Sequence, residues 1–221
     1  MPSDTDTVGI AGLRFFGQMS ASISHEIKNV LAIINENAGL LKDYTLMADK
    51  GLDLNPHKVG LKADKIMTQV ARADEIIKKM NRFAHSIDQN REQINPNAIL
   101  ELMIALTERT AAMKSIKLEL ELSASSEFVL ITTAPFFLEN LVWMCLDFAL
   151  NVIEEYGTLK LGCEQTAKGA LIRFANLNKL ASAQSHSFPN DTVTALAAAL
   201  NADLFTDPAS GELTITLPKE M

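Results

Sequence analysis

The segment Ser20 to Leu31, with the sequence SASISHEIKNVL, decides how the chain is organised. It lies inside a longer stretch in which apolar and small residues recur at alternating steps of four and three. The members of this repeat are Phe16, Ser20, Ile23, Ile27, Val30, Ile34, Ala38 and Leu41. A period near 3.5 residues predicts a long amphipathic helix whose seam packs against another helix.

His25 is expected on the side of this helix that faces away from the seam. At about 100° per residue, its side chain points roughly 160° to 200° away from Ile23 and Ile27. The residues that share its side are Lys28, Asn29, Ala32 and Glu36. One interpretation of this pattern is a solvated polar face that happens to carry a histidine.

The neighbours of His25 favour a chemical role. A neutral imidazole is a good nucleophile at neutral pH. Attack on phosphorus requires that nucleophile, an acceptor for the proton on its other nitrogen, and open space for a bulky partner. Glu26 is a candidate for the acceptor, and the outward direction of His25 supplies the space.

The run Ser24-His25-Glu26-Ile27-Lys28-Asn29, followed by Leu31-Ala32-Ile33-Ile34, resembles the phosphoacceptor box of bacterial sensor histidine kinases. In that family the box lies on the first helix of a dimerisation and histidine-phosphotransfer hairpin. The family often has a proline five residues after the histidine. This chain has Val30 there, so we expect a straighter helix.

Residues 1–94 are predicted to form such a hairpin. Met1 to Val8 are expected to be frayed, the first helix to run from about Gly9 to Tyr44, and the second from about Lys58 to Asp88. The repeat of the second helix comprises Ile66, Val70, Ala73, Ile77, Met80, Ala84 and Ile87. One hairpin cannot bury a long seam alone, so we expect two copies to form a four-helix bundle. The alternative is a seam covered by the C-terminal half of the same chain.

Residues 95–221 are predicted to form a second domain, after a polar joint over 88–95. Helices are expected at 96–114, 134–155 and 192–201, and strands at 116–122, 128–133, 158–164, 170–176, 204–206 and 212–217. This order predicts an α/β sandwich with helices on one face of a sheet, and hence an α+β chain.

The layout of this second half resembles the ATP-binding domain of the same kinases, but the residues for ATP chemistry are missing. The two positions where the family has magnesium-binding asparagines fall on Met144 and Phe148, which have no oxygen ligands. Ala175-Asn176-Leu177-Asn178 stands where the adenine-binding aspartate and its glycines are expected. No glycine lies between Gly169 and Gly211 to approach phosphates closely. We therefore expect neither ATP nor a bound metal.

A retained histidine beside a lost ATP site resembles the histidine phosphotransferases of bacterial phosphorelays. The resemblance implies an enzyme without autokinase activity that moves a phosphoryl group between receiver-domain aspartates through His25. Glu26 would be the base or orienting group, and Asn29 would bind a phosphoryl oxygen or a water. The residues expected to dock the receiver are Lys28, Ala32, Ile33 and Glu36. Magnesium would come from the acidic pocket of the receiver, and packing is expected to outweigh charge steering.

Three other functions stay open. Glu26 and Asn29 also resemble the acid and amide with which some kinases hydrolyse the aspartyl phosphate of a response regulator. A non-catalytic dimeric signalling scaffold needs no chemistry at His25. A working kinase with an unfamiliar ATP site is the third.

Composition limits the remaining classes. The chain has 221 residues, 48% of them hydrophobic, and a net charge of -7, which argues against nonspecific nucleic-acid binding. Cys145 and Cys163 are expected to be buried free thiols. The apolar segment 135–153 contains Glu139, Asn140 and Asp147, so it is expected to be a buried helix and not a membrane span. Residues 1–12 show no signal peptide, and almost nothing precedes the phosphoacceptor helix. We therefore expect a cytoplasmic signal-transduction protein that senses nothing directly.

Overall fold

A computed structural model describes residues 4–122, 129–181 and 188–221. The chain divides into two compact units. One contains Gly17–Ala84, and the other contains Met1–Phe16 together with His85–Met221. The first helix, α1 (Asp4–Asp49), therefore contributes residues to both units. The predicted domain boundary at residue 94 stays a prediction.

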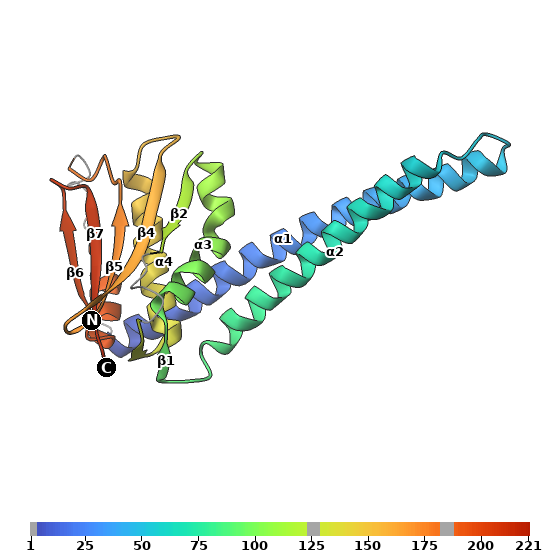
Figure 1. Cartoon of the computed structure of the whole chain (residues 1–221). Helices are drawn as coiled ribbons and strands as arrows, with labels where there is room; N and C mark the ends of the chain where they lie inside the picture. Colours follow the sequence, from blue (N-terminus) through green and yellow to red (C-terminus); the bar gives the residue numbers. More distant parts are fainter. Residues whose placement is uncertain (1–3, 123–128, 182–187) are drawn as a thin grey trace. The chain divides into compact units, whose positions relative to one another are not determined.

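The unit Gly17–Ala84 is an antiparallel helical hairpin, as the sequence predicted. The helix α1 is joined through residues 50–55 to α2 (Pro56–His85), and the two helices run in opposite directions (Figure 1). Gly51 in the connection has φ +82°, a left-handed conformation that favours glycine. The prediction of a frayed start as far as Val8 is wrong from Asp4 onward, because Asp4 already belongs to α1 and Val8 is buried. Met1 to Ser3 lie outside the described residues.

The buried face of the hairpin differs from the predicted seam in α2. On α1, Ile23 and Val30 of the predicted repeat are buried, but Phe16 and Ala38 are exposed, and Asn37, which lies outside the repeat, is buried instead. On α2 the buried apolar side chains are Ile76 and Phe83. Four members of the predicted repeat of the second helix are instead exposed, namely Val70, Ile77, Met80 and Ile87. The apolar surface of α2 is wider than one seam, and the hairpin uses only the stripe beside the predicted one.

The other unit is built on a five-stranded sheet with the order β2-β4-β5-β7-β6. Its strands are β2 (Lys117–Glu121), β4 (Thr158–Thr166), β5 (Gly169–Ala175), β6 (Asp203–Asp207) and β7 (Glu212–Pro218). Only the β2–β4 pair is parallel. Three helices, α3 (Pro96–Met113), α4 (Pro135–Val152) and α5 (Asp191–Ala199), cover one face of this sheet (Figure 1). The predicted fold class, a helical hairpin followed by an α/β sandwich, is confirmed.

Alternation along the strands explains why only one face of the sheet is covered. In β7, Leu213, Ile215 and Leu217 are fully buried, while the residues between them are half-buried. Successive side chains of a strand point to opposite faces, so this pattern gives the sheet one apolar face for the helices and one open face.

A small second sheet was not predicted. The strand β1 (Glu92–Ile94) pairs antiparallel with β3 (Ile131–Thr133), far along the chain. Sequence analysis assigned residues 88–95 to a polar joint, because three residues are too few to show a strand period. Phe128, the expected start of the second strand, lies outside the described residues.

The helix α4 forms the core of its unit. By length and composition it is apolar enough to cross a membrane, but 67% of it is buried inside the protein. Its buried residues include Leu138, Leu141, Leu146 and the two polar residues Glu139 and Asn140. Ser86 Oγ donates a hydrogen bond of 2.7 Å to Glu139 Oε2, which satisfies part of this buried carboxyl group. The prediction of a mostly buried helix is confirmed.

The first turns of α1 pack against α4. The ring of Phe15, with no exposed surface, lies 5.5 Å from Phe136 and 5.5 Å from Trp143, centroid to centroid. Gly12 allows this approach, since a Cβ there would lie 3.1 Å from Phe136 Cε1. The N-terminal residues of α1 are therefore part of the core around α4, although the sequence placed them in the hairpin.

Replacing Phe15 by alanine tests this packing. A large buried aromatic ring removed from a core costs about 3–5 kcal/mol of unfolding free energy. We expect Phe15→Ala to destabilise the protein by about 3 kcal/mol and to change the emission of Trp143, the single tryptophan. Leu13→Ala is the control, because Leu13 lies on the same part of α1, is 77% exposed and should change stability little. Equal effects of the two changes on chemical denaturation would contradict the packing described.

Candidate functional site

His25 lies in the middle of an uninterrupted part of α1 and is exposed. Within the residues that the structure describes, its ring makes no hydrogen bond and no ion pair. The helix therefore fixes the direction of the side chain, while both ring nitrogens are open to solvent or to a partner. This is the environment that the sequence predicted for a nucleophile that meets a large substrate.

The residues predicted to surround His25 share its exposed side. Lys28, Asn29, Ala32 and Glu36 are all exposed, and Ile33 is half-buried at the margin. Ile23 and Val30 are buried, which turns the opposite side of α1 toward the core of the hairpin. The structure thus brings the predicted docking residues together on one surface, and their roles stay predictions.

Glu26 is half-buried and forms no hydrogen bond with His25 in the described part of the chain. Consecutive residues of a helix point about 100° apart and do not face each other. Glu26 therefore lies beside His25, at the border between the polar face and the buried face. A role as base or orienting group requires a rotamer change or a bridging water when a partner docks.

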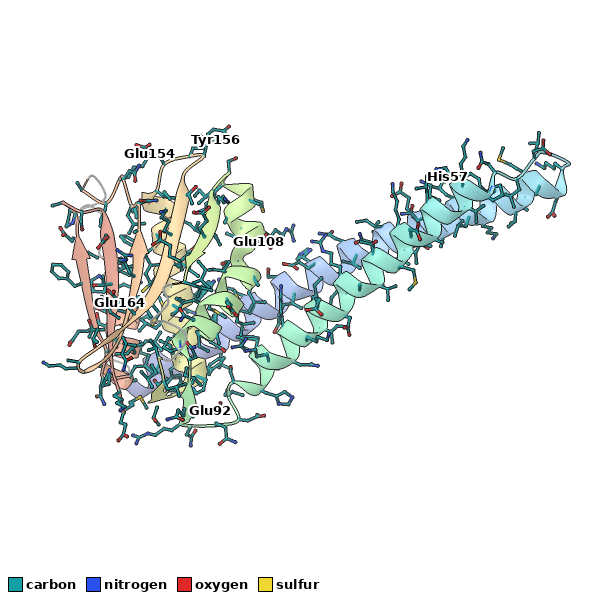
Figure 2. All side chains as sticks on the ribbon, in the orientation of Figure 1. His57, Glu92, Glu108, Glu154, Tyr156 and Glu164 are labelled. Atoms are coloured by element: carbon teal, nitrogen blue, oxygen red, sulfur yellow. The ribbon has the colours of Figure 1, made fainter. Side chains whose placement is uncertain are left out.

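The other histidines do not join this site. His57 lies in the first turn of α2, next to the connection between the helices (Figure 2), and its backbone N–H donates to Asn55 Oδ1 at 3.0 Å. His85 Nδ1 lies 2.7 Å from Asp88 Oδ2, in an exposed local pair. His186 lies outside the described residues.

The residues at the expected nucleotide-binding positions do not fit a magnesium nucleotide. Met144 and Phe148 are half-buried on α4, and Phe148 stacks on Phe188 with a centroid distance of 3.9 Å and an interplanar angle of 8°. Asn176, after β5, has φ +71° and donates a hydrogen bond from Nδ2 to Thr158 O at 2.9 Å. The thioether of Met144 and the stacked ring of Phe148 offer no oxygen ligands for a cation. Among the described residues there is also no group of three or more His, Cys, Asp or Glu side chains arranged to hold a metal ion.

The two cysteines are free and buried, as predicted. Burial raises the pKa of the Cys145 thiol far above its ordinary value. Burial, with a smaller contribution from the charge of Glu164, raises the pKa of Cys163 to about 12. Both side chains therefore stay protonated at neutral pH and are poor nucleophiles.

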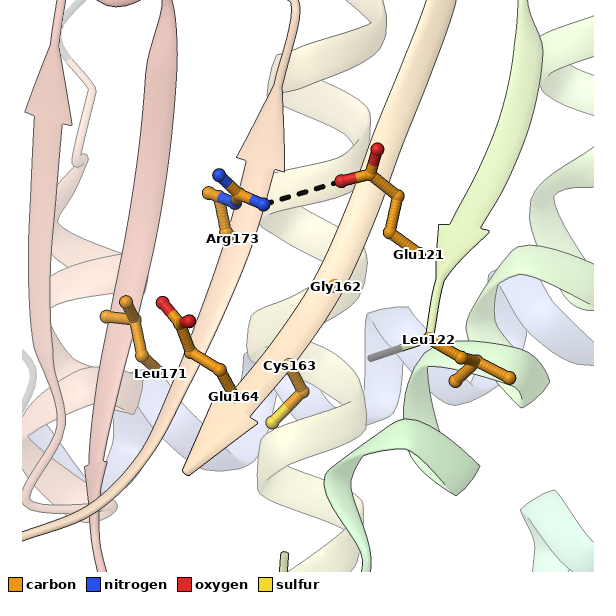
Figure 3. Close-up of a pocket in the computed structure, with 7 residues that line it drawn as sticks. All are labelled: Glu121, Leu122, Gly162, Cys163, Glu164, Leu171 and Arg173. Carbon is orange, nitrogen blue, oxygen red and sulfur yellow. Dashed lines mark hydrogen bonds and ion pairs between the residues drawn. The ribbon is translucent and has the colours of Figure 1, made fainter. Parts of the chain in front are cut away.

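A shallow pocket of about 180 Å³ lies on the open face of the sheet, over Gly162. Glu121 and Arg173 stand on the strands to either side, and their charged groups meet at 3.4 Å (Figure 3). Lys160 Nζ also contacts Glu121 Oε1 at 2.7 Å, and this hydrogen bond lowers the pKa of Glu121. Because Arg173 also contacts Glu212, at 3.5 Å, these charges largely compensate one another. We interpret this cluster as an ion-pair network of the sheet surface.

Sequence reasoning left the contribution of α2 to the His25 surface unnamed. The structure shows which side of α2 is buried, through Ile76 and Phe83. The charged residues on the flanks of that buried side can then be assigned. The signal in the sequence is a seven-residue spacing of basic residues, which an apolar periodicity search does not detect.

No family model matches the chain, and no curated protein sequence matches it. Solved histidine kinases are similar in structure. Acinetobacter baumannii histidine kinase AdeS has a TM-score of 0.48 and 14% identity, over 83% of this chain and 95% of that chain. Histidine kinase ThkA, in complex with the response regulator protein TrrA, has a TM-score of 0.47 and 16% identity, over 94% of this chain and 63% of that chain. The ATP-binding domain of PrrB from Mycobacterium tuberculosis has a TM-score of 0.46 and 15% identity, over 59% of this chain and 98% of that chain. At these identities the likeness is one of fold, and the chemistry of the site has to be argued from the residues of this chain.

Proposed function

We propose that the protein is a phosphorelay histidine phosphotransferase that carries a phosphoryl group on His25. The observation that carries the proposal is an exposed imidazole, free of intramolecular partners in the described residues, on a helix face with Lys28, Asn29 and Ala32. The residues at the nucleotide positions, Met144 and the stacked Phe148, favour a function without ATP.

The proposed reaction is reversible phosphoryl transfer. One ring nitrogen of His25 attacks the phosphorus of an aspartyl phosphate on a receiver domain. The N–P bond forms as the P–O bond breaks, and the aspartate leaves as a carboxylate. The proton on the other ring nitrogen passes to water or to Glu26. The second step runs in reverse onto the aspartate of another receiver. Catalysis is then chiefly alignment of donor, phosphorus and acceptor.

A second candidate is a phosphatase of a phosphorylated response regulator. Asn29, one helical turn after His25 and exposed on the same side, is placed to hydrogen-bond a water, and Glu26 is the nearest acid. Such a reaction needs no nucleophilic histidine. A non-catalytic scaffold stays the third candidate, in which the same surface binds without transferring a group.

We also propose that the working form is a homodimer in the cytoplasm, where receiver domains act. The apolar side chains that the hairpin leaves exposed form a second stripe on α2 and include Leu31 on α1. Leu31 on α1 and Val70, Ile77 and Met80 on α2 are between 40% and 54% exposed. A second copy would bury these side chains in a four-helix bundle, on the side of the hairpin away from His25.

Labelling of His25 tests the transferase against its rivals. Purified receiver domains carrying radioactive phosphate on aspartate are mixed with wild-type protein and with His25→Ala. We expect acid-labile, base-stable label on the wild type only, and transfer of that label to a second receiver. The variant should lose at least about a hundredfold in transfer rate, since a covalent carrier has no substitute. Receivers that lose phosphate equally fast with His25→Ala would favour the phosphatase, and receivers left untouched would favour the scaffold.

Charge introduced on the second apolar stripe tests the dimer. We expect wild-type protein to sediment at twice its chain mass of 24.2 kDa, and Val70→Glu with Ile77→Glu to sediment at 24.2 kDa. Both side chains are nearly half exposed in one chain, so the change opposes association more than folding. Ala71→Glu is the matched control, because Ala71 is exposed on the same helix and points at least about 100° away from Val70 and Ile77. A monomeric wild type would remove this part of the proposal.

Nucleotide binding offers a further test. We expect no measurable heat when magnesium ATP at up to about 1 mM is titrated into the protein. This concentration would detect a binding free energy of about 4 kcal/mol or more. A sensor histidine kinase run under the same conditions is the positive control. Tight, magnesium-dependent binding of ATP would instead support the hypothesis of a working kinase.

A further inference from the structure

The helix α2 carries a row of four basic residues at seven-residue intervals: Lys58, Lys65, Arg72 and Lys79. Seven residues are close to two turns of an α-helix, so the four side chains share one face. All four are exposed. We call these residues the basic row.

The basic row lies on one flank of the buried side of α2. At about 100° per residue, Arg72 and Lys79 point roughly 40° and 60° to one side of the buried Ile76. The exposed Ile77 points about 100° to the other side. The two flanks of α2 therefore differ in chemistry, with apolar side chains on one and cations on the other.

Angles measured in the same way on α1 place His25 on the flank that corresponds to the flank of Arg72 and Lys79 on α2. Measured from the buried Val30, Asn29 and Glu36 point roughly 100° and 120° to one side, with His25 slightly beyond. Leu31 points about 100° to the other side. Because the two helices run antiparallel, equal rotations lead to the same side of the hairpin. His25, Arg72 and Lys79 thus share one side of the hairpin, and the exposed Leu31 and Ile77 share the other.

Counting back from the connection at residues 50–55 gives the levels along the hairpin. By this count the buried Ile23 is level with the buried Phe83, and the buried Val30 is level with the buried Ile76. In this register Lys79 is level with Ile27, between His25 and Asn29. Arg72 is level with Ile34, beside the docking residues Ala32 and Glu36.

Among the residues that the structure describes, the members of the basic row make no short contact with an acidic side chain. Within the described part of the chain, none of its four members forms an ion pair. Their neighbour Lys78, which points elsewhere, contacts Asp74 at 2.8 Å and Glu75 at 2.9 Å. The whole chain has a net charge of -7, so this row is a local exception.

We propose that the basic row steers and seats the anionic phosphoaspartyl site of a receiver domain against His25, with Lys79 the cation nearest to the phosphoryl group. This inference rests on the proposed phosphotransfer function. A phosphoryl group carries about two negative charges near neutral pH, and it sits among carboxylates on the donor. Two acidic proteins repel at long range, and a local row of cations reverses that field at the place where they must meet. Charge steering therefore acts on this surface in addition to packing.

Neutralising the row tests the inference. The triple variant Lys65→Gln, Arg72→Gln, Lys79→Gln is compared with Lys78→Gln, whose lysine is 63% exposed and already paired. The probe is a receiver domain that labels wild-type His25, held in its beryllofluoride-activated form. Association rates are measured from about 0.05 M to about 0.5 M salt, where the Debye length falls from roughly 14 Å to 4 Å.

We expect the triple variant to associate about tenfold more slowly than wild type at low salt, and the difference to close at high salt. The control should behave as wild type, and the sedimentation of all three proteins should agree. Equal rates at low salt, or a loss that salt does not change, would overturn the inference. If His25 of the triple variant is labelled as fast as wild type, only this inference fails. If no receiver labels wild-type His25, the phosphotransfer function itself fails.

Discussion

The structure depends on how one helix divides its surface. Ile23, Val30 and Asn37 repeat every seven residues on α1 and are buried, and this fixes which way every other side chain of the helix points. Leu31 then falls on one flank and His25 with Asn29 on the other. Because α1 has one buried stripe, the polar residues around His25 and the exposed apolar residue Leu31 lie on opposite flanks of that stripe. The hairpin packing therefore places His25 and the exposed Leu31 on different flanks of α1.

The unit around α4 is packed through aromatic side chains at two places along this helix. Phe148 stacks on Phe188 at 3.9 Å, at a position where the resembled family has a metal ligand. Phe15 from the start of α1 packs between Phe136 and Trp143 at the other end of α4. Aromatic contacts of this kind are worth about 0.5–1.5 kcal/mol beyond the area they bury. Both contacts therefore stabilise the packing of the unit around α4.

Much of the fold was readable from the sequence, because its elements carry strong periodic signals. The helices α1 and α2, the β4–β5 pair around Gly169, and the burial of Cys145 follow from apolar period and turn residues. Three features were not readable. The strand β1 is three residues long, its partner β3 lies almost forty residues away, and no local pattern encodes that pairing. The choice of Phe15 over Phe16 as the buried ring depends on α4, which a helical repeat cannot anticipate. The buried stripe of α2 was misassigned because two apolar stripes lie side by side, and only the fold shows which one faces α1.

The exposed position of His25 fits the thermodynamics of a carrier better than those of a terminal catalyst. A carrier must accept a phosphoryl group and release it again, so its site should stabilise neither the free nor the phosphorylated histidine strongly. Fixed hydrogen bonds to the ring or a resident metal would favour one of these states, and each 1.4 kcal/mol of preference slows one direction about tenfold. Within the described residues, His25 has neither. In the proposed transfer, discrimination between partners arises from the surface on which they dock, to which Ala32, Ile33, Glu36 and the basic row contribute shape and charge. In this transfer, the bound receiver supplies the acidic pocket and its magnesium, and the hairpin holds His25 in position.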